Sequence, residues 1–129
     1  MFILIMKIKS IFLLILFFAC SDNDNNDEEV VEIPEVVSYK MDIQPLFESG
    51  CINCHGNQGQ LSLTTYDNTM KGGKTGVIVI PNNGAGSLLI KKLDGTASGQ
   101  RMPPPPVDPW SQIKISLVKK WIDEGAKNN

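Results

Sequence analysis

Histidine is almost absent from this chain of 129 residues, since His55 is the only one. Cysteine is scarce as well and occurs only at Cys20, Cys51 and Cys54. A metal site with two histidine ligands from this chain is therefore excluded. A structural zinc ion prefers four nitrogen or sulfur ligands, whereas no single region of the sequence offers more than three.

Other patterns are missing too. The tripeptide Gly73-Lys74-Thr75 resembles the end of a phosphate-binding loop, but the glycine required five positions earlier is replaced by Asn68. We find no βαβ pattern of the kind that carries a thioredoxin-like cysteine pair. The apolar run Ile11–Ala19 is also shorter than the about 20 residues that a transmembrane helix needs.

The first 19 residues have the pattern of an export signal instead. Lys7 and Lys9 precede the short apolar run, and the small residue Ala19 comes directly before a cysteine. A basic start, a short apolar core and a small residue at the end are typical of a cleaved signal peptide. Because residues 2–6 are themselves apolar, an uncleaved membrane anchor remains the alternative.

The sequence Phe17-Phe18-Ala19-Cys20 resembles a bacterial lipobox. It departs from the usual pattern because Phe17 occupies the position where leucine is favoured, and Phe18 the position of a small residue. We expect cleavage before Cys20 and attachment of lipid to this cysteine, with a buried or free cysteine as the alternative. The protein is then an exported, membrane-anchored lipoprotein, on the periplasmic side or at the cell surface of the outer membrane.

Residues 20–38 are expected to form a lipidated, acidic and flexible tether. Residues 21–38 contain seven acidic residues and no basic one. Such a stretch buries too little apolar surface to fold and extends by charge repulsion. The acidic cluster also resembles export signals of some surface-displayed lipoproteins. Residues 39–129 remain as a single small domain.

Cys51-Ile52-Asn53-Cys54-His55 has the C-x-x-C-H spacing of c-type haem attachment. In such a site each thiol adds to one haem vinyl group, and the adjacent histidine becomes the proximal iron ligand. Attachment takes place outside the cytoplasm, which agrees with the export signal. The cysteine count agrees as well, because lipid takes one thiol and haem takes two. Half of a zinc site, a redox-active pair and a chance loop sequence are the alternatives.

The domain is predicted to be all-α. Helices are expected at Asp42–Gly50 and at Ser111–Glu124, with shorter ones at Thr65–Lys71 and Ser87–Leu93. The extended, apolar run Val77–Ile80 is too isolated to indicate a sheet. Such a small domain buries only a modest core, and a covalently held haem would supply much of its apolar centre.

The last predicted helix has clear boundaries and one apolar face. Ser111 is its expected N-cap and Gly125 its stop signal. The apolar stripe of this helix consists of Ile115, Val118, Trp121 and Ile122. We expect it to pack on Leu46 and Phe47.

Methionine is the usual sixth haem ligand in electron-transfer cytochromes c. Met41 lies too close to the attachment motif, and Met70 is predicted to be a packing residue. Met102 lies in a loop and precedes four prolines, which are expected to form a stiff strut about 12 Å long. Met102 is therefore the candidate ligand, and a polyproline linker or recognition site is the alternative.

Several other residues have two interpretations. Arg101 is a candidate partner for a haem propionate, or a solvated side chain. Trp110 and Trp121 are candidates for shielding the haem edge, although core packing is favoured for Trp121. Four lysines are candidates for a docking surface, although a solvated face is favoured: Lys71, Lys74, Lys91 and Lys92.

A series of motifs extends over residues 39–129. In chain order they are Tyr39-x-x-Asp42-Ile43-x-Pro45-x-Phe47, Cys51-x-x-Cys54-His55-Gly56, Leu61-x-Leu63, Tyr66, Gly72-Gly73, Pro81, Ser87-Leu88-Leu89, Arg101-Met102-Pro103-Pro104 and Trp121-Ile122-x-x-Gly125-Ala126. With these motifs, residues 39–129 resemble the planctomycete-type cytochrome c domain. The resemblance implies a small helical cytochrome c fold wrapped around one haem, with Cys51 and Cys54 attached to it, His55 proximal and Met102 distal. The segment Pro106–Gln112 departs from the family because it is less acidic.

These observations predict a monohaem c-type cytochrome that carries single electrons outside the cytoplasm and is not an enzyme. A haem-based sensor or small-ligand binder with a labile sixth position is the alternative. A peroxidase would need a second haem motif or a spare histidine, and the sequence has neither. Unidentified redox proteins and the membrane are the expected partners, and nucleic acid is not.

Overall fold

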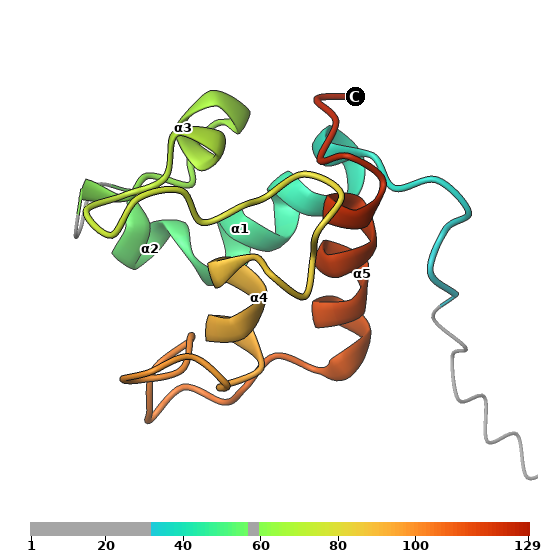
Figure 1. The fold of residues 1–129 in the computed structure, drawn as a ribbon. Coiled ribbons are helices and arrows are strands. Elements are labelled where there is room, and N and C mark those ends of the chain that lie inside the picture. The colour runs from blue at the N-terminus through green and yellow to red at the C-terminus, as the bar shows by residue number, and fades with distance from the viewer. Residues whose placement is uncertain (1–31, 57–59) are drawn as a thin grey trace, which may run out of the picture. The chain divides into compact units, whose positions relative to one another are not determined.

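The computed structural model describes residues 32–56 and 60–129, and these residues form a helical domain (Figure 1). Within the described ranges there is no strand, only one isolated bridge between Gly73 and Gly76, so the prediction of an all-α fold is confirmed. No helix in these ranges has the length and apolarity to cross a bilayer. The elements are η1 (Tyr39–Ile43), α1 (Gln44–Gly50), α2 (Ile52–His55), α3 (Tyr66–Lys71), α4 (Leu88–Leu93) and α5 (Gln112–Asp123).

The predicted export signal, residues 1–19, and the predicted lipidation site Cys20 lie outside the described residues.

The first predicted helix has two parts. The single π-helical turn η1 comes first, and α1 follows with Pro45 in its first turn, where no backbone N–H is needed. The side chain of Ser38 caps η1 by accepting a hydrogen bond from the amide of Met41 at 3.2 Å. Phe47 is fully buried and Leu46 is half-buried against the core.

Helix α5 has the predicted boundaries and apolar face. The hydroxyl of Ser111 accepts the amide N–H of Lys114 at 3.5 Å, and Gly125 follows the helix with φ at +99°. All four stripe residues are buried. The helix packs against η1 and α4, and Phe47 belongs to the same core cluster.

An aromatic cluster joins the two ends of the domain. The ring of Tyr39 lies 5.2 Å, centroid to centroid, from the rings of both Tyr66 and Trp121. Trp121 is fully buried, so the prediction that it packs in the core is confirmed. Burial also raises the pKa of the Tyr39 phenol, which lies within 3.3 Å of the hydroxyl of Thr69.

The segment just before η1 is part of this body. Val37, which the sequence analysis assigns to the tether, is only 2% exposed. Its amide donates to Glu124 on α5 at 3.0 Å, and the amide of Tyr39 donates to the side chain of Asn129 at 2.9 Å. The ammonium of Lys120 also donates to the carbonyl of Pro34 at 2.7 Å.

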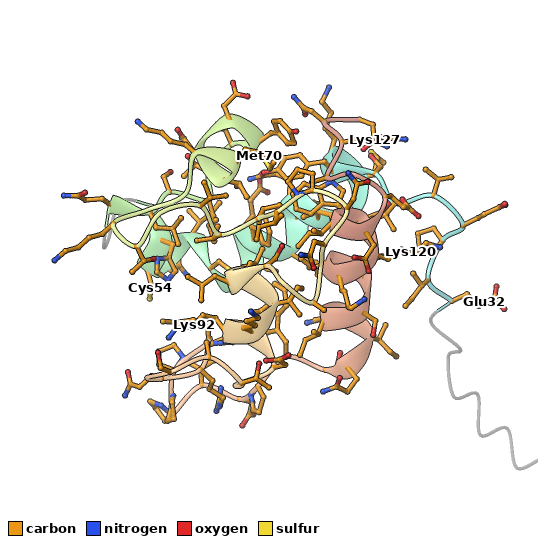
Figure 2. All side chains as sticks on the ribbon, in the orientation of Figure 1. Glu32, Cys54, Met70, Lys92, Lys120 and Lys127 are labelled. Atoms are coloured by element: carbon orange, nitrogen blue, oxygen red, sulfur yellow. The ribbon has the colours of Figure 1, made fainter. Side chains whose placement is uncertain are left out.

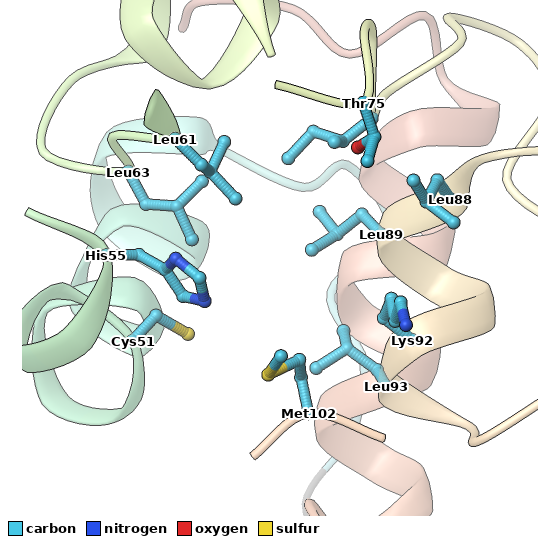
Figure 3. Close-up of a pocket in the computed structure, with 11 residues that line it drawn as sticks. Cys51, His55, Leu61, Leu63, Thr75, Leu88, Leu89, Lys92, Leu93 and Met102 are labelled. Carbon is cyan, nitrogen blue, oxygen red and sulfur yellow. The ribbon is translucent and has the colours of Figure 1, made fainter. Parts of the chain in front are cut away.

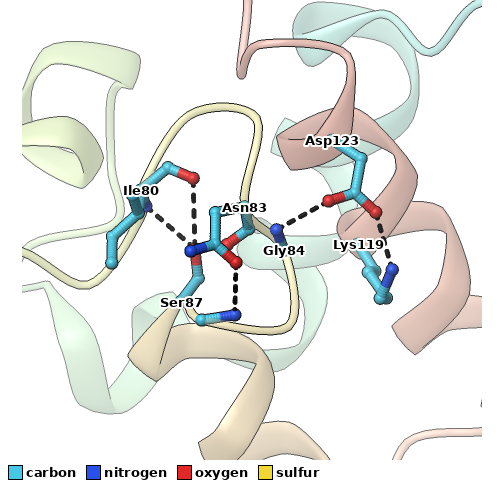
Figure 4. A network of polar contacts seen from close by, with 7 residues as sticks. Ile80, Asn83, Gly84, Ser87, Lys119 and Asp123 are labelled. Atoms are coloured by element: carbon cyan, nitrogen blue, oxygen red, sulfur yellow. Dashed lines mark hydrogen bonds and ion pairs between the residues drawn. The ribbon is translucent and has the colours of Figure 1, made fainter.

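A polar network fixes the loop before α4 against α5 (Figure 4). The buried hydroxyl of Ser87 accepts the amide of Ile80 at 2.8 Å and donates to the carbonyl of Asn83. The amide of Gly84 donates to Asp123 at 2.6 Å. A Cβ at residue 84 would lie 3.0 Å from the carbonyl oxygen of Lys119, so only glycine allows this approach. The network therefore joins the loop before α4 to α5.

Candidate haem site

An apolar cavity of about 130 Å³ lies between α2 and α4 (Figure 3). Cys51 and His55 lie on one side of it, and Met102 faces them from the other side. The full lining is Cys51, His55, Leu61, Leu63, Thr75, Ile78, Leu88, Leu89, Lys92, Leu93 and Met102. The structure thus brings together three of the residues that the sequence analysis selected.

One turn of helix positions the residues of the C-x-x-C-H motif. The amides of Cys54 and His55 both donate to the carbonyl of Cys51, at 3.1 and 2.7 Å. Residues four apart share a helix face, so Cys51 and His55 both line the cavity. Cys54 is exposed (Figure 2) and is not part of the lining.

The two cysteines are free thiols. Burial, with a smaller contribution from nearby Cys54, raises the pKa of the Cys51 thiol to about 11. This thiol is therefore neutral at pH 7, unlike the low-pKa thiol of a thioredoxin-like pair. The described residues also contain no cluster of three or more His, Cys, Asp or Glu side chains that could hold a metal ion. This part of the chain therefore offers no set of ligands for zinc.

His55 carries the most informative polar atom of the site. Its Nδ1 is buried and has no hydrogen-bond partner among the described residues. A buried polar atom without a hydrogen-bond partner destabilises the fold. An imidazole, a thiol and a thioether on the walls of an apolar cavity fit a haem, whose iron takes nitrogen and sulfur ligands.

The helix before the motif ends against a tryptophan. A Cβ at Gly50 would lie 2.9 Å from the ring of Trp110. The half-buried indole therefore packs directly on the residue before Cys51, and glycine is required for this contact. Trp110 thus supports the position where the motif begins.

A backbone hydrogen bond joins the loop that carries Met102 to the end of α4. The amide of Met102 donates to the carbonyl of Lys92 at 2.7 Å. The proline run does not form the predicted straight strut, because the amide of Val107 donates to the carbonyl of Pro104 at 3.1 Å and closes a turn. Met41, by contrast, is 78% exposed, and Met70 packs partly buried against the core.

Arg101 directly precedes Met102 in the sequence and is not part of the cavity lining. Its guanidinium donates to the carbonyls of Pro103 and Val107, the latter at 2.9 Å. It therefore closes the proline turn. These contacts were not apparent from the sequence, which suggested only a propionate or solvent as its partner.

Sequence reasoning missed two polar residues of the lining, Thr75 and Lys92. Helical spacing was the available signal for Lys92, because a residue three or four positions after Leu88 and Leu89 shares their face. The ammonium of Lys92 donates to two backbone carbonyls. This lysine is thus engaged within the domain, whereas the sequence suggested a solvated or docking residue.

The family model described as Planctomycete cytochrome C matches residues 51–106. Residues 51–106 are therefore similar to a planctomycete-type cytochrome c domain. The match begins at the first cysteine of the motif and ends after Met102, so both sides of the cavity lie within it, and the predicted family is confirmed for this segment. A cytochrome c domain implies haem c. No curated protein matches the chain.

Proposed function

We propose that this protein is a monohaem c-type cytochrome that carries single electrons outside the cytoplasm, with iron ligated by His55 and Met102. The observation that carries the proposal is the placement of both side chains on opposite sides of one apolar cavity. The cytochrome c domain also fits an electron carrier rather than an enzyme.

Each residue of the site has a separate role in this proposal. The thiols of Cys51 and Cys54 would hold the haem covalently, and His55 would supply the proximal nitrogen. The bound haem supplies one-electron chemistry at its iron. The leucines of the lining exclude water from the cavity, and exposed Cys54 marks the edge of the site that meets solvent.

The assignment of the second ligand follows from the residues that face His55. A second histidine does not exist in this chain, and Met102 lines the opposite wall. A thioether ligand raises the reduction potential of the haem, as expected of an electron carrier. Lipid on Cys20 would keep the domain at a membrane, and redox proteins are its proposed partners.

Replacing the proposed ligand tests this function. We expect ferric wild-type protein to show a sulfur-to-iron charge-transfer band, and Met102→Ala to lose the band and to have a lower reduction potential. Met41→Ala is the matched control, because Met41 is exposed, and it should retain both properties. If the wild-type protein lacks the band and binds added imidazole as tightly as Met102→Ala, the sixth position is labile and the sensor alternative holds.

A further inference from the structure

Lys92 lies between the cavity and the loop that leads to Met102. Its half-buried side chain lines the cavity. Its ammonium donates to the carbonyl of Ser98 at 2.7 Å and to that of Gln100 at 3.2 Å, and its own carbonyl accepts the amide of Met102. One residue of α4 therefore holds the loop at three points.

The backbone of this loop directs two carbonyl groups toward the ammonium of Lys92. Gly99, which separates the two acceptor residues, has φ at +80°, a conformation that glycine adopts without steric cost. A Cβ at this position would lie 3.5 Å from the Nζ of Lys92. The two carbonyls on either side of Gly99 both accept from the same nitrogen.

We propose that Lys92 is a positioning residue for Met102. Its ammonium and its carbonyl oxygen hold residues 98–102 so that the thioether faces His55 across the cavity. This inference rests on the proposed ligation of iron by Met102. A single thioether ligand competes with any stronger base that enters the cavity, so its occupancy depends on how firmly the loop is held.

The variant Lys92→Leu removes the ammonium and keeps an apolar side chain along the cavity wall. Leucine has no group that could bind iron, and the substitution removes the positive charge together with the two hydrogen bonds to the loop. Lys91→Leu is the matched control, because this neighbouring lysine is exposed and its replacement changes the net charge equally. Lys92→Arg retains a charged donor and serves as the conservative variant.

The measurement is the dissociation constant of imidazole from the ferric holoprotein, because imidazole must displace Met102. The two hydrogen bonds are exposed to solvent, so we expect a moderate effect. Lys92→Leu should bind imidazole about tenfold more tightly than the wild type, equivalent to about 1.4 kcal/mol. Lys91→Leu should stay within about twofold, and Lys92→Arg should lie closer to the wild type than Lys92→Leu.

A second background tests whether Lys92 acts through the methionine. In Met102→Ala there is no thioether to displace, so adding Lys92→Leu should alter imidazole affinity less than about twofold. An equal effect in both backgrounds would show that Lys92 acts on the cavity itself and would overturn the inference. An unchanged affinity in the single variant Lys92→Leu would overturn it as well.

Gly99→Ala provides the same test if Lys92→Leu does not accumulate with haem. Alanine strains the left-handed position and should also tighten imidazole binding. An unchanged affinity would count against the proposed role of Lys92.

The two proposals fail in distinguishable ways. Wild-type protein that binds imidazole as tightly as Met102→Ala would refute the ligation and this inference together. A wild type that binds far more weakly, with no effect of Lys92→Leu, refutes this inference alone.

Discussion

Cys51 and His55 belong to one turn of helix, whereas Met102, on the opposite wall of the cavity, belongs to a loop much later in the chain. Two short backbone hydrogen bonds within the motif fix the first side, which we call the attachment side. The other side, which carries Met102 and which we call the methionine side, depends on contacts between α4 and a loop without regular structure, and on contacts within that loop. One side is thus defined by local geometry and the other by tertiary contacts.

This difference indicates a division of roles. In the proposed function the attachment side would determine whether haem is held at all, because the covalent bonds and the proximal ligand would come from five consecutive residues. The methionine side would determine the properties of the iron, because its single proposed ligand could leave without releasing the haem. Predictions that separate the two sides therefore test the comparison.

The largest expected difference lies between His55→Ala and Met102→Ala. We expect His55→Ala to reduce the fraction of protein that carries covalent haem by about tenfold or more, because the proximal bond is lost. Met102→Ala should retain nearly all of its haem. Haem absorbance per mole of purified protein measures both fractions. Equal loss of haem in the two variants would contradict the division of roles.

Arg101→Gln should have an intermediate effect, confined to the methionine side. The substitution removes the charged donor that closes the proline turn, so we expect imidazole to bind the ferric protein about threefold to tenfold more tightly. Haem content should not change. Lys91→Gln, on the exposed surface, controls for the lost charge. If Arg101→Gln alters haem content but not imidazole affinity, the residue acts on the attachment side, for instance through a propionate.

The smallest effect is expected at Asp123, which joins α5 to the loop before α4. A hydrogen bond from Lys119, together with the amide of Gly84, lowers the pKa of its carboxyl group. A lowered pKa in the folded state means that this stabilisation is present above the ordinary value of 3.8 and is lost as the pH falls through the folded pKa. Since its side chain is 40% exposed, we expect Asp123→Asn to lower the free energy of unfolding by only a few tenths of a kcal/mol at pH 7.

Urea unfolding of the wild type and of Asp123→Asn at pH 7 and at pH 3 measures this effect. The difference between the two proteins should shrink at the lower pH, because the wild-type carboxylate becomes protonated. Lys114→Gln, at the exposed start of α5, is the control for a changed surface charge. A difference that grows on acidification would contradict the assigned sign.

Local patterns in the sequence predicted the attachment side and the last helix. The spacing of Cys51 and His55 defines one helix face, and Ser111 and Gly125 delimit α5 at the expected places. Each of these features depends on residues within a few positions of one another. The choice of Met102 over Met41 also followed from sequence separation, and only Met102 lines the cavity.

The remaining features depend on contacts between distant segments. Val37 is held by hydrogen bonds with Glu124 and Asn129, which lie far from it in the sequence. The residues next to Val37 in the sequence suggested a tether instead. The role of Lys92 requires the left-handed backbone of Gly99, which composition does not predict. The proline run turns because a hydrogen bond and Arg101 close it, whereas proline content alone suggested an extended strut.

The central claim is that Cys51 and Cys54 hold one haem between His55 and Met102. A pyridine haemochrome assay of protein matured in the periplasm tests it most directly, because the spectrum depends on whether the haem vinyl groups are saturated. We predict a spectrum of haem with both vinyl groups saturated, at one haem per chain. A spectrum of haem with free vinyl groups, or protein that carries no haem, would contradict the claim.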